Sequence, residues 1–323
     1  MKKDMNTSEV RSVWAAYALN DDLRMKSSSG AMFSIIAEHI LEQGGIVYGV
    51  ALEQNCRVAK YIRITEQENL FKVRGSKYIQ AQMGETFKNV KEDLELNKLV
   101  LFTGSGCQVN GLKLFLKKDY KNLICMDVIC HGVPSPKLWR KYVDYIEKKR
   151  RKKIVRINFR SKEQGWDKFG VKEYYDKDNI FVPRKQHPYM MFFLRNLCLR
   201  PVCYECPAKK NKLADLSIGD FWGINQVVAE MNDDKGISVV LIRTEKGESF
   251  FEQIESDVCI KEVSYEEGIR KNSAEFSSCK KPLGRDKFYI DMNRMGFGRL
   301  KWKYLWKPIM KERVKLFKEK YMK

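Results

Sequence analysis

The sequence lacks the features of a membrane-spanning or secreted protein. No run of apolar residues is long enough to cross a bilayer. Residues 1–17 contain lysines but no apolar stretch behind them, so they do not form a secretory signal. In a chain of 323 residues without an export signal, the nine cysteines are expected to be reduced or metal-bound rather than paired in disulfides. We therefore expect a cytoplasmic protein.

Acidic residues are also scarce, with 41 Asp and Glu against 61 Lys and Arg and a formal net charge of +20. The excess of positive charge is concentrated in Lys148–Lys153 and in Arg299–Lys323. The second segment contains ten Lys and Arg but only two Glu. The second segment predicts a helix that Pro308 should kink, with apolar residues on one face. These residues are Trp302, Leu305, Trp306, Ile309, Met310, Val314 and Phe317. We interpret it as a docked terminal helix with a solvated basic face. A membrane surface or an anionic partner stays open as its ligand, and nucleic acid is less favoured.

The sequence has neither a complete P-loop nor a GxGxxG motif. It does have an apolar strand, Leu99 to Thr103, followed by the turn Gly104-Ser105-Gly106-Cys107-Gln108 and a helix through Leu116. Strand, glycine turn and helix is the layout of a ligand-binding loop in an open α/β sheet. Cys107 is open to three interpretations: a metal ligand, a redox thiol or a small residue at a tight turn.

A second candidate loop is rich in serine. Ser27, Ser28, Ser29 and Gly30 precede a predicted helix that ends before Gly44. Hydroxyls and free backbone N–H groups at a helix start can bind an anion such as a phosphate. An ordinary N-cap would explain one of the three serines equally well.

Three cysteines fall within nine residues, at the spacing C-x4-C-x2-C: Cys198, Cys203 and Cys206. Such a loop can fold its sulfurs around one metal centre. Cys130 follows a predicted strand, 123–129, and is the best candidate for a fourth ligand, although His131 could replace it. The spacing favours an iron–sulfur cluster over zinc, because an x4 gap is unusual for zinc knuckles. Zinc and unliganded cysteines stay open.

The order of elements predicts an α/β fold. We expect a mixed sheet flanked by helices, a smaller strand-rich region that carries the cysteine loop, and a basic C-terminal helix. The strand-rich region is predicted from alternating segments at 154–159, 170–175 and 180–183. We divide the chain into an α/β region at 1–152, the strand-rich region at 153–260 and a helical extension at 261–323. The boundary near 150–155 is soft, because no low-complexity linker marks it.

Several uncommon segments together resemble the beta subunits of coenzyme F420-reducing hydrogenases and related dehydrogenases. They occur in that family's order over roughly residues 10–255. They are SSSG at 27–30, GSKY at 75–78, FTGSGCQVNGL at 102–112, ICHGVPSP at 129–136, NFRSKEQGW at 158–166, CLRPVCYEC at 198–206, LSIGDFWG at 216–223 and KGISVVLIRTEKG at 235–247.

This resemblance implies an oxidoreductase subunit that binds FAD and a 4Fe-4S cluster. It places the flavin phosphates and ribityl chain at Ser27–Gly30 and at the turn Thr103–Gln108, which includes Gly104. Lys77 and Tyr78 would neutralise or stack on the flavin. The neighbouring Arg200 and Lys209 would favour the reduced cluster. The implied cluster ligands are Cys130, Cys198, Cys203 and Cys206. Cys107 is the substitute if one of them is not a ligand.

The sequence departs from the family in two places. It has no pair of C-x2-C-x2-C-x3-C-P runs, so we expect a ferredoxin or a ferredoxin-like subunit to deliver electrons, and a redox small molecule to exchange hydride with the flavin. The family's Gly-Thr-Pro-Cys turn reads Gly104-Ser105-Gly106-Cys107 here.

Two alternative functions are a zinc-stabilised module with a basic polyanion-binding surface and a non-catalytic docking subunit.

Overall fold

A nine-stranded mixed sheet forms the larger layer of the structure, which is a computed structural model and is described here for residues 10–321. Across the sheet the strand order is β12-β1-β11-β10-β6-β5-β2-β3-β4. The strands are β1 (Ser12–Ala18), β2 (Ile46–Glu53), β3 (Val58–Ile64), β4 (Ala81–Gln82), β5 (Val100–Ser105), β6 (Leu123–Val128), β10 (Leu216–Asp220), β11 (Ser238–Ile242) and β12 (Val258–Val263).

The central strands β2, β5, β6 and β10 run parallel. Strand β11 is antiparallel to both β10 and β1, so β1 runs in the same direction as the central strands. The carboxyl ends of β1, β5, β6 and β10 therefore lie at one edge of the sheet, called here the carboxyl edge. Open α/β sheets bind their ligands at such an edge.

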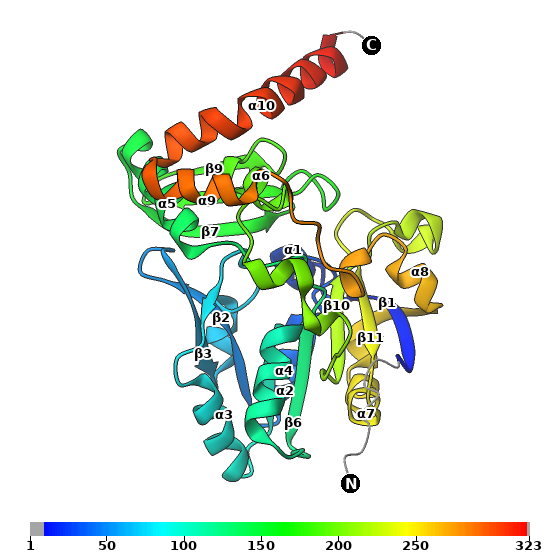
Figure 1. Ribbon diagram of the computed structural model, residues 1–323. Helices are drawn as coiled ribbons and strands as arrows, with labels where there is room; N and C mark the ends of the chain where they lie inside the picture. Colours follow the sequence, from blue (N-terminus) through cyan, green and yellow to red (C-terminus); the bar gives the residue numbers. More distant parts are fainter. Residues whose placement is uncertain (1–9, 322–323) are drawn as a thin grey trace.

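Helices cover both faces of this sheet, as Figure 1 shows. On one face, α2 (Met32–Glu42) and α7 (Glu245–Glu252) bury Ile36 and Phe250 against side chains such as Leu101. On the other, α3 (Thr86–Glu95) and α4 (Gly106–Leu116) pack on Val100 and Phe102. Successive residues of β5 thus face opposite helices, which explains why its sequence is apolar at nearly every position.

A smaller antiparallel sheet lies beyond the carboxyl edge (Figure 1) and is formed by β7 (Ile154–Ser161), β8 (Gly170–Tyr175) and β9 (Asn179–Pro183). It shares one aromatic core with α5 (Pro136–Arg150), α6 (Pro188–Leu194), α9 (Arg285–Arg294) and α10 (Phe297–Tyr321). Trp139 and Tyr189 are fully buried in this core. The remaining α-helices of the described chain are α1 (Asp21–Lys26) and α8 (Tyr265–Ile269).

The predicted α/β class is confirmed, with a large mixed sheet, a small antiparallel sheet and a C-terminal helix. Strand β3 ends at Ile64, and a 3-10 helix follows over Gln67–Lys72. Strands of the large sheet come from both 1–152 and 153–260. The division at 152 and the extension at 261–323 stay predictions.

The C-terminal helix differs from the expected docked helix in which side it buries. Leu300 and Leu305 are fully buried, whereas Trp302 is 73% exposed and Trp306 is 47% exposed. Phe317 lies outside the residues whose side chains are described. Among residues 10–321, no helix combines the length and the apolar character needed to cross a membrane.

Candidate functional site

A pocket at the carboxyl edge is built from the segments that follow β5 and β6 and from the cysteine loop. Its lining residues are Ser105, Gly106, Cys107, Asp127, Val128, Cys130, His131, Gly132, Val133, Cys203, Cys206, Ala208, Lys209 and Lys212. The segments are far apart in the sequence, so the fold itself assembles this group. Functional residues concentrate in loops that a rigid sheet positions in this way.

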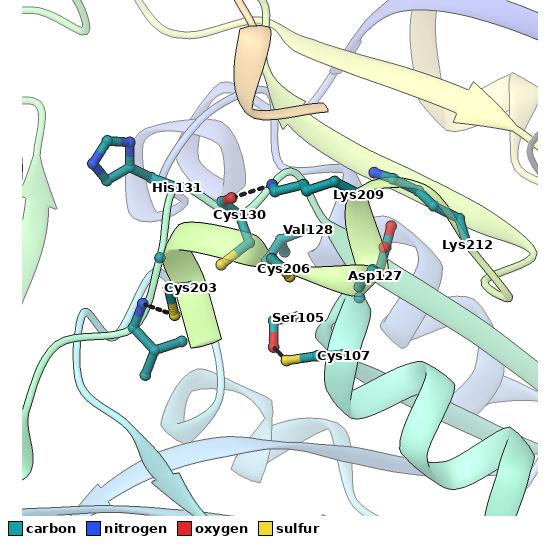
Figure 2. A pocket seen from close by; sticks show the side chains of 14 residues that line it. Ser105, Cys107, Asp127, Val128, Cys130, His131, Cys203, Cys206, Lys209 and Lys212 are labelled. Atoms are coloured by element: carbon teal, nitrogen blue, oxygen red, sulfur yellow. Dashed lines mark hydrogen bonds between the residues drawn. The ribbon is translucent and has the colours of Figure 1, made fainter. Parts of the chain in front are cut away.

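Four cysteines line the pocket, and Figure 2 shows their sulfur atoms directed into a common space. Cys107 is in the first turn of α4, and Cys130 follows the end of β6. Cys203 lies in the 3-10 helix Pro201–Glu205, and Cys206 ends that helix. Two proline residues set this loop: Pro201 starts one 3-10 helix and Pro207 starts the next.

Cys198 lies elsewhere. It is fully buried in the aromatic core and does not line the pocket. Its backbone oxygen accepts hydrogen bonds from the N–H of Ser135 at 2.9 Å and from the hydroxyl of Tyr289 at 2.8 Å. The adjoining bridge between Pro134 and Leu199 fixes this segment. Cys198 as a metal ligand stays a prediction, and the arrangement of the pocket favours Cys107 in its place.

A further thiol, Cys279, contacts the cysteine loop and was missed by sequence reasoning. Its sulfur is 3.6 Å from the backbone oxygen of Cys203, and the hydroxyl of the preceding Ser278 accepts the N–H of Cys206 at 2.9 Å. No spacing pattern links Cys279 to the other cysteines, because it lies more than seventy positions after Cys206 in sequence. Only the fold brings it close.

Burial governs the protonation of these thiols. It raises the pKa of Cys130 to about 12, an effect that the nearby Lys209 ammonium partly offsets. It also raises the pKa of Cys203, whose sulfur accepts the backbone N–H of Val133 at 3.4 Å. At neutral pH such thiols lose their protons when a metal binds, because the metal ion replaces the proton on each sulfur. Soft thiolates in this setting suit zinc or iron–sulfur centres.

Lysines and one carboxylate complete the pocket. The Lys209 ammonium donates to the backbone oxygen of Cys130 at 2.5 Å, and Lys212 pairs with Glu275 at 2.5 Å. Asp127 is buried, and burial raises its pKa. Within the described chain its Oδ1 atom has no hydrogen-bond partner. A buried polar atom without a partner is unusual in proteins and marks a position that bound material can satisfy.

His131, a possible ligand by sequence, and Asp220, in the segment at 216–223, are engaged outside the thiol cluster. The His131 ring points away from the sulfurs in Figure 2 and hydrogen bonds to Asn196 at 2.6 Å. Asp220 pairs with Arg160 and accepts the indole N–H of Trp166 at 2.9 Å. Both side chains therefore organise the surroundings of the pocket.

The serine segment and the segment at residues 75–78 are joined directly. The Ser28 hydroxyl accepts the backbone N–H of Ser76 at 2.9 Å and lies 3.1 Å from the Ser76 hydroxyl. The Ser29 hydroxyl donates to the oxygen of Ile237 at 2.6 Å. The Ser27 hydroxyl donates to the oxygen of Leu23 at 2.8 Å and lies 3.2 Å from the Ser34 hydroxyl. Gly30 packs so tightly that a Cβ there would lie 2.3 Å from the Ala16 oxygen.

Lys77 and Tyr78 are half-buried beside this serine segment. Burial, together with the nearby Arg74, lowers the pKa of Lys77 to about 7. The Tyr78 ring lies 4.9 Å from that of Phe193, which is in turn 5.2 Å from the ring of His131. Phe193 thus connects the serine side of the carboxyl edge with the cysteine side.

The turn at residues 103–108 satisfies its own polar groups. The Thr103 hydroxyl donates to the oxygen of Tyr48 at 3.1 Å. The Gln108 side chain accepts the N–H of Ser105 at 2.9 Å and so caps α4. A Cβ at Gly104 would meet the Tyr61 hydroxyl at 2.4 Å. These residues hold Cys107 in position, and a flavin contact for them stays a prediction.

Arg160 is a further site residue that sequence reasoning did not single out, although it lies in the NFRSK segment. It is 3% exposed, and one guanidinium nitrogen donates to the Ser28 oxygen at 3.2 Å and to Asp220. Its Nε atom is buried and has no partner among residues 10–321. A desolvated guanidinium beside a serine loop is suited to bind a phosphate.

Comparisons with known proteins identify the family of this chain. Residues 97–267 match the family model for the C-terminal part of the coenzyme F420 hydrogenase/dehydrogenase beta subunit, and residues 13–88 match the model for its N-terminal part. The chain belongs to this family. Membership of the coenzyme F420 hydrogenase/dehydrogenase beta-subunit family supports an oxidoreductase role for it.

A solved structure with the same fold is a chain of the F420-reducing [NiFe] hydrogenase complex from Methanosarcina barkeri. The TM-score is 0.54 and the sequence identity 16%, over 84% of the present chain and 93% of that chain. At this identity the likeness concerns the fold alone. A search of curated proteins found no match.

Proposed function

We propose that this beta-subunit family member is a flavin- and iron–sulfur-dependent oxidoreductase. Electrons would pass between a 4Fe-4S cluster, FAD and a two-electron carrier or substrate. A bound flavin exchanges electron pairs with substrates and single electrons with metal centres, which is the chemistry that such a protein positions. The observation that carries the proposal is the convergence of four cysteines from three separate segments on one pocket.

The C-x4-C-x2-C spacing supports a cluster rather than a single zinc ion, because an x4 gap is unusual for zinc knuckles. We assign ligation of the cluster to the pocket cysteines, which are Cys107, Cys130, Cys203 and Cys206.

The chain also offers a place for the flavin pyrophosphate. The Arg160 guanidinium contacts the Ser28 backbone oxygen, and its buried Nε atom has no partner among the described residues. The Ser28–Ser76 contact joins two of the segments expected to hold FAD. Lys77, whose pKa is lowered to about 7, would regain its full charge next to a phosphate. Tyr78 and Phe193 would then shield the isoalloxazine ring of the flavin from water. They would lie between the flavin site and the cysteine pocket.

A protein partner is part of the proposal. The similar solved chain comes from a hydrogenase complex, and the four thiols that line the pocket suffice for one cluster. We therefore assign electron delivery to a separate ferredoxin or ferredoxin-like subunit in the cytoplasm. The final acceptor or donor is a redox small molecule.

Metal and flavin analysis of one anaerobic preparation tests the proposal. We expect a brown protein that contains FAD, with iron and acid-labile sulfide in the ratio of a 4Fe-4S cluster. Stoichiometric zinc without iron would instead support the zinc-stabilised module. A colourless protein that takes up neither cofactor on reconstitution would overturn the assignment. Full cofactor loading without reductase activity towards any tested carrier would favour the docking subunit.

A further inference from the structure

Helix α10 is held by its first turns and extends away from the rest of the protein (Figure 1). The Phe297 ring contacts the rings of Tyr142 at 5.1 Å and Phe192 at 5.7 Å. Tyr304 donates to Asp291 at 2.6 Å, and Lys303 pairs with the same carboxylate at 2.6 Å. These contacts with α5, α6 and α9 fix the direction in which the helix leaves the body.

A line of apolar side chains runs along the outer side of this helix. Trp302 is 73% exposed, Trp306 47%, Met310 51% and Val314 51%. Residues four apart on a helix are neighbours, so the four side chains form one continuous stripe of about 18 Å, at 1.5 Å per residue. We call it the α10 stripe. Burying large apolar side chains is favourable, so a contiguous exposed stripe marks an interaction surface.

Cations border the α10 stripe. Lys307 and Lys311 are exposed beside it, and the Lys307 ammonium lies 5.4 Å from the centre of the Trp306 ring. Over 299–323 the sequence has ten Lys and Arg against two Glu. A second copy of so basic a helix would be repelled, which disfavours self-association through this surface. The charge calls for an anionic partner.

We propose that the α10 stripe docks this protein onto an anionic membrane surface. Lipid headgroups supply negative charge to the lysines, and the adjoining acyl region accepts Trp, Met and Val side chains. Indole rings favour this boundary, because they are apolar with one polar N–H. A flexible polyanion would satisfy the lysines but leave Met310 and Val314 in water. The helix would lie in the interface plane, and no residue of it lines the cysteine pocket.

Vesicle flotation of the full chain tests this proposal without reference to cofactors. The vesicles contain phosphatidylcholine alone or with about 30 mol% phosphatidylglycerol, at low and physiological salt. We expect binding only to the anionic vesicles, weakened by salt. The double variant W302S/W306S should bind at least about tenfold more weakly, since two apolar anchors are lost. K307Q/K311Q should lose about tenfold, because each cation near the surface contributes.

Matched controls separate the stripe from general effects. F71S/L96S removes two comparably exposed apolar side chains elsewhere, and K117Q/K121Q removes the same charge at the far end of α4. Neither should change flotation more than twofold. W302F/W306F should keep binding, which shows that loss in the serine variant is not a folding defect. Thermal unfolding checks that every variant is folded.

Three outcomes would overturn the proposal. The first is no flotation with anionic vesicles, or equal flotation of the control variants and the stripe variants. The second is binding to poly-L-glutamate or to a single-stranded oligonucleotide that W302S/W306S abolishes, because a polyanion would then be the partner. The third is a concentration-dependent dimer that the same variant dissociates in sedimentation.

Discussion

Two clusters of buried polar side chains in this molecule differ in their hydrogen bonding. In the layer of the small sheet, the Glu173 carboxylate accepts from Tyr142, from Tyr175 at 2.6 Å and from His187 at 3.2 Å. At the carboxyl edge, Asp127 Oδ1 has no partner within the described chain, and neither has the Nε atom of Arg160, whose side chain reaches this edge from β7 of the small sheet. A closed network stabilises the fold, whereas open buried groups indicate a place for something to bind. The Nε atom of Arg285 on α9 and the Tyr120 hydroxyl are also without a partner within the described chain, so the contrast concerns these two clusters and not every buried polar group.

The largest expected effect concerns two cysteines, one at the carboxyl edge and one in the aromatic core of the small-sheet layer. Because Cys107 lines the pocket and Cys198 is fully buried elsewhere, C107S should lose most of its iron, whereas C198S should keep it. Iron and sulfide content of anaerobically reconstituted protein, together with the visible absorbance near the charge-transfer bands of the cluster, provides the measurement. Loss of iron in C198S but not in C107S would identify Cys198 as the fourth ligand. Circular dichroism controls for folding.

The second prediction addresses the closed network. Although burial alone would raise it, hydrogen bonds from His187, Tyr142 and Tyr175 lower the pKa of Glu173 to about 2. E173Q should reduce the free energy of unfolding by about 2–4 kcal/mol at neutral pH, because it removes a buried, fully bonded carboxylate. The exposed E163Q should change it by less than about 0.5 kcal/mol. Iron content per folded chain should stay unchanged.

The same variant has a defined pH dependence. The folded-state pKa of Glu173 lies below its ordinary value of 4.5, so its contribution to stability is complete above about pH 4.5. The contribution is lost as pH falls towards about 2. The difference in unfolding free energy between wild type and E173Q should therefore shrink over that window in urea titrations. A constant difference would mean that the effect comes from packing rather than from the charge.

The third prediction addresses the open groups at the carboxyl edge. Arg160→Lys keeps the positive charge but removes the guanidinium, including its unpartnered Nε donor, so the dissociation constant for FAD should rise about tenfold. Flavin fluorescence titration of the flavin-free chain measures it. Arg156→Lys, on the exposed part of the same strand, is the matched control and should leave FAD binding unchanged. Equal FAD affinity of the Arg160→Lys and Arg156→Lys variants would show that Arg160 does not contact the flavin.

Sequence patterns predicted the fold well wherever the local signal was strong. The apolar strand at 99–103, its glycine turn and the following helix correspond to β5 and α4, because burial on both faces produces an unmistakable apolar run. Strand β12 was missed, since Val258–Val263 has exposed charges at the sheet edge. The sequence pattern placed the residues of the α10 stripe on the same packed face as Leu305. Apolar residues three or four positions apart fit one helix face, so the pattern could not separate the exposed residues from the buried one.

The candidate site was only partly predictable, for a physical reason. Cys203, Cys206 and Cys130 are recognisable from short spacing or from their place after a strand. Whether Cys107 or Cys198 joins them depends on the bridge between Pro134 and Leu199, which is a long-range contact without a sequence signature. The free Nε atom of Arg160 likewise follows from tertiary packing alone.

The smallest expected effect concerns Cys279, the thiol that lies beside the cysteine loop without lining the pocket. Its sulfur is a weak donor to the Cys203 oxygen at 3.6 Å, so C279S should alter the free energy of unfolding by less than about 1 kcal/mol. Iron content should equal that of wild type. A C107S/C279S double variant sharpens the test: if Cys279 substitutes as a ligand when Cys107 is removed, C107S alone keeps some iron and the double variant keeps none. Equal iron in the two variants confines cluster ligation to the four thiols that face the pocket.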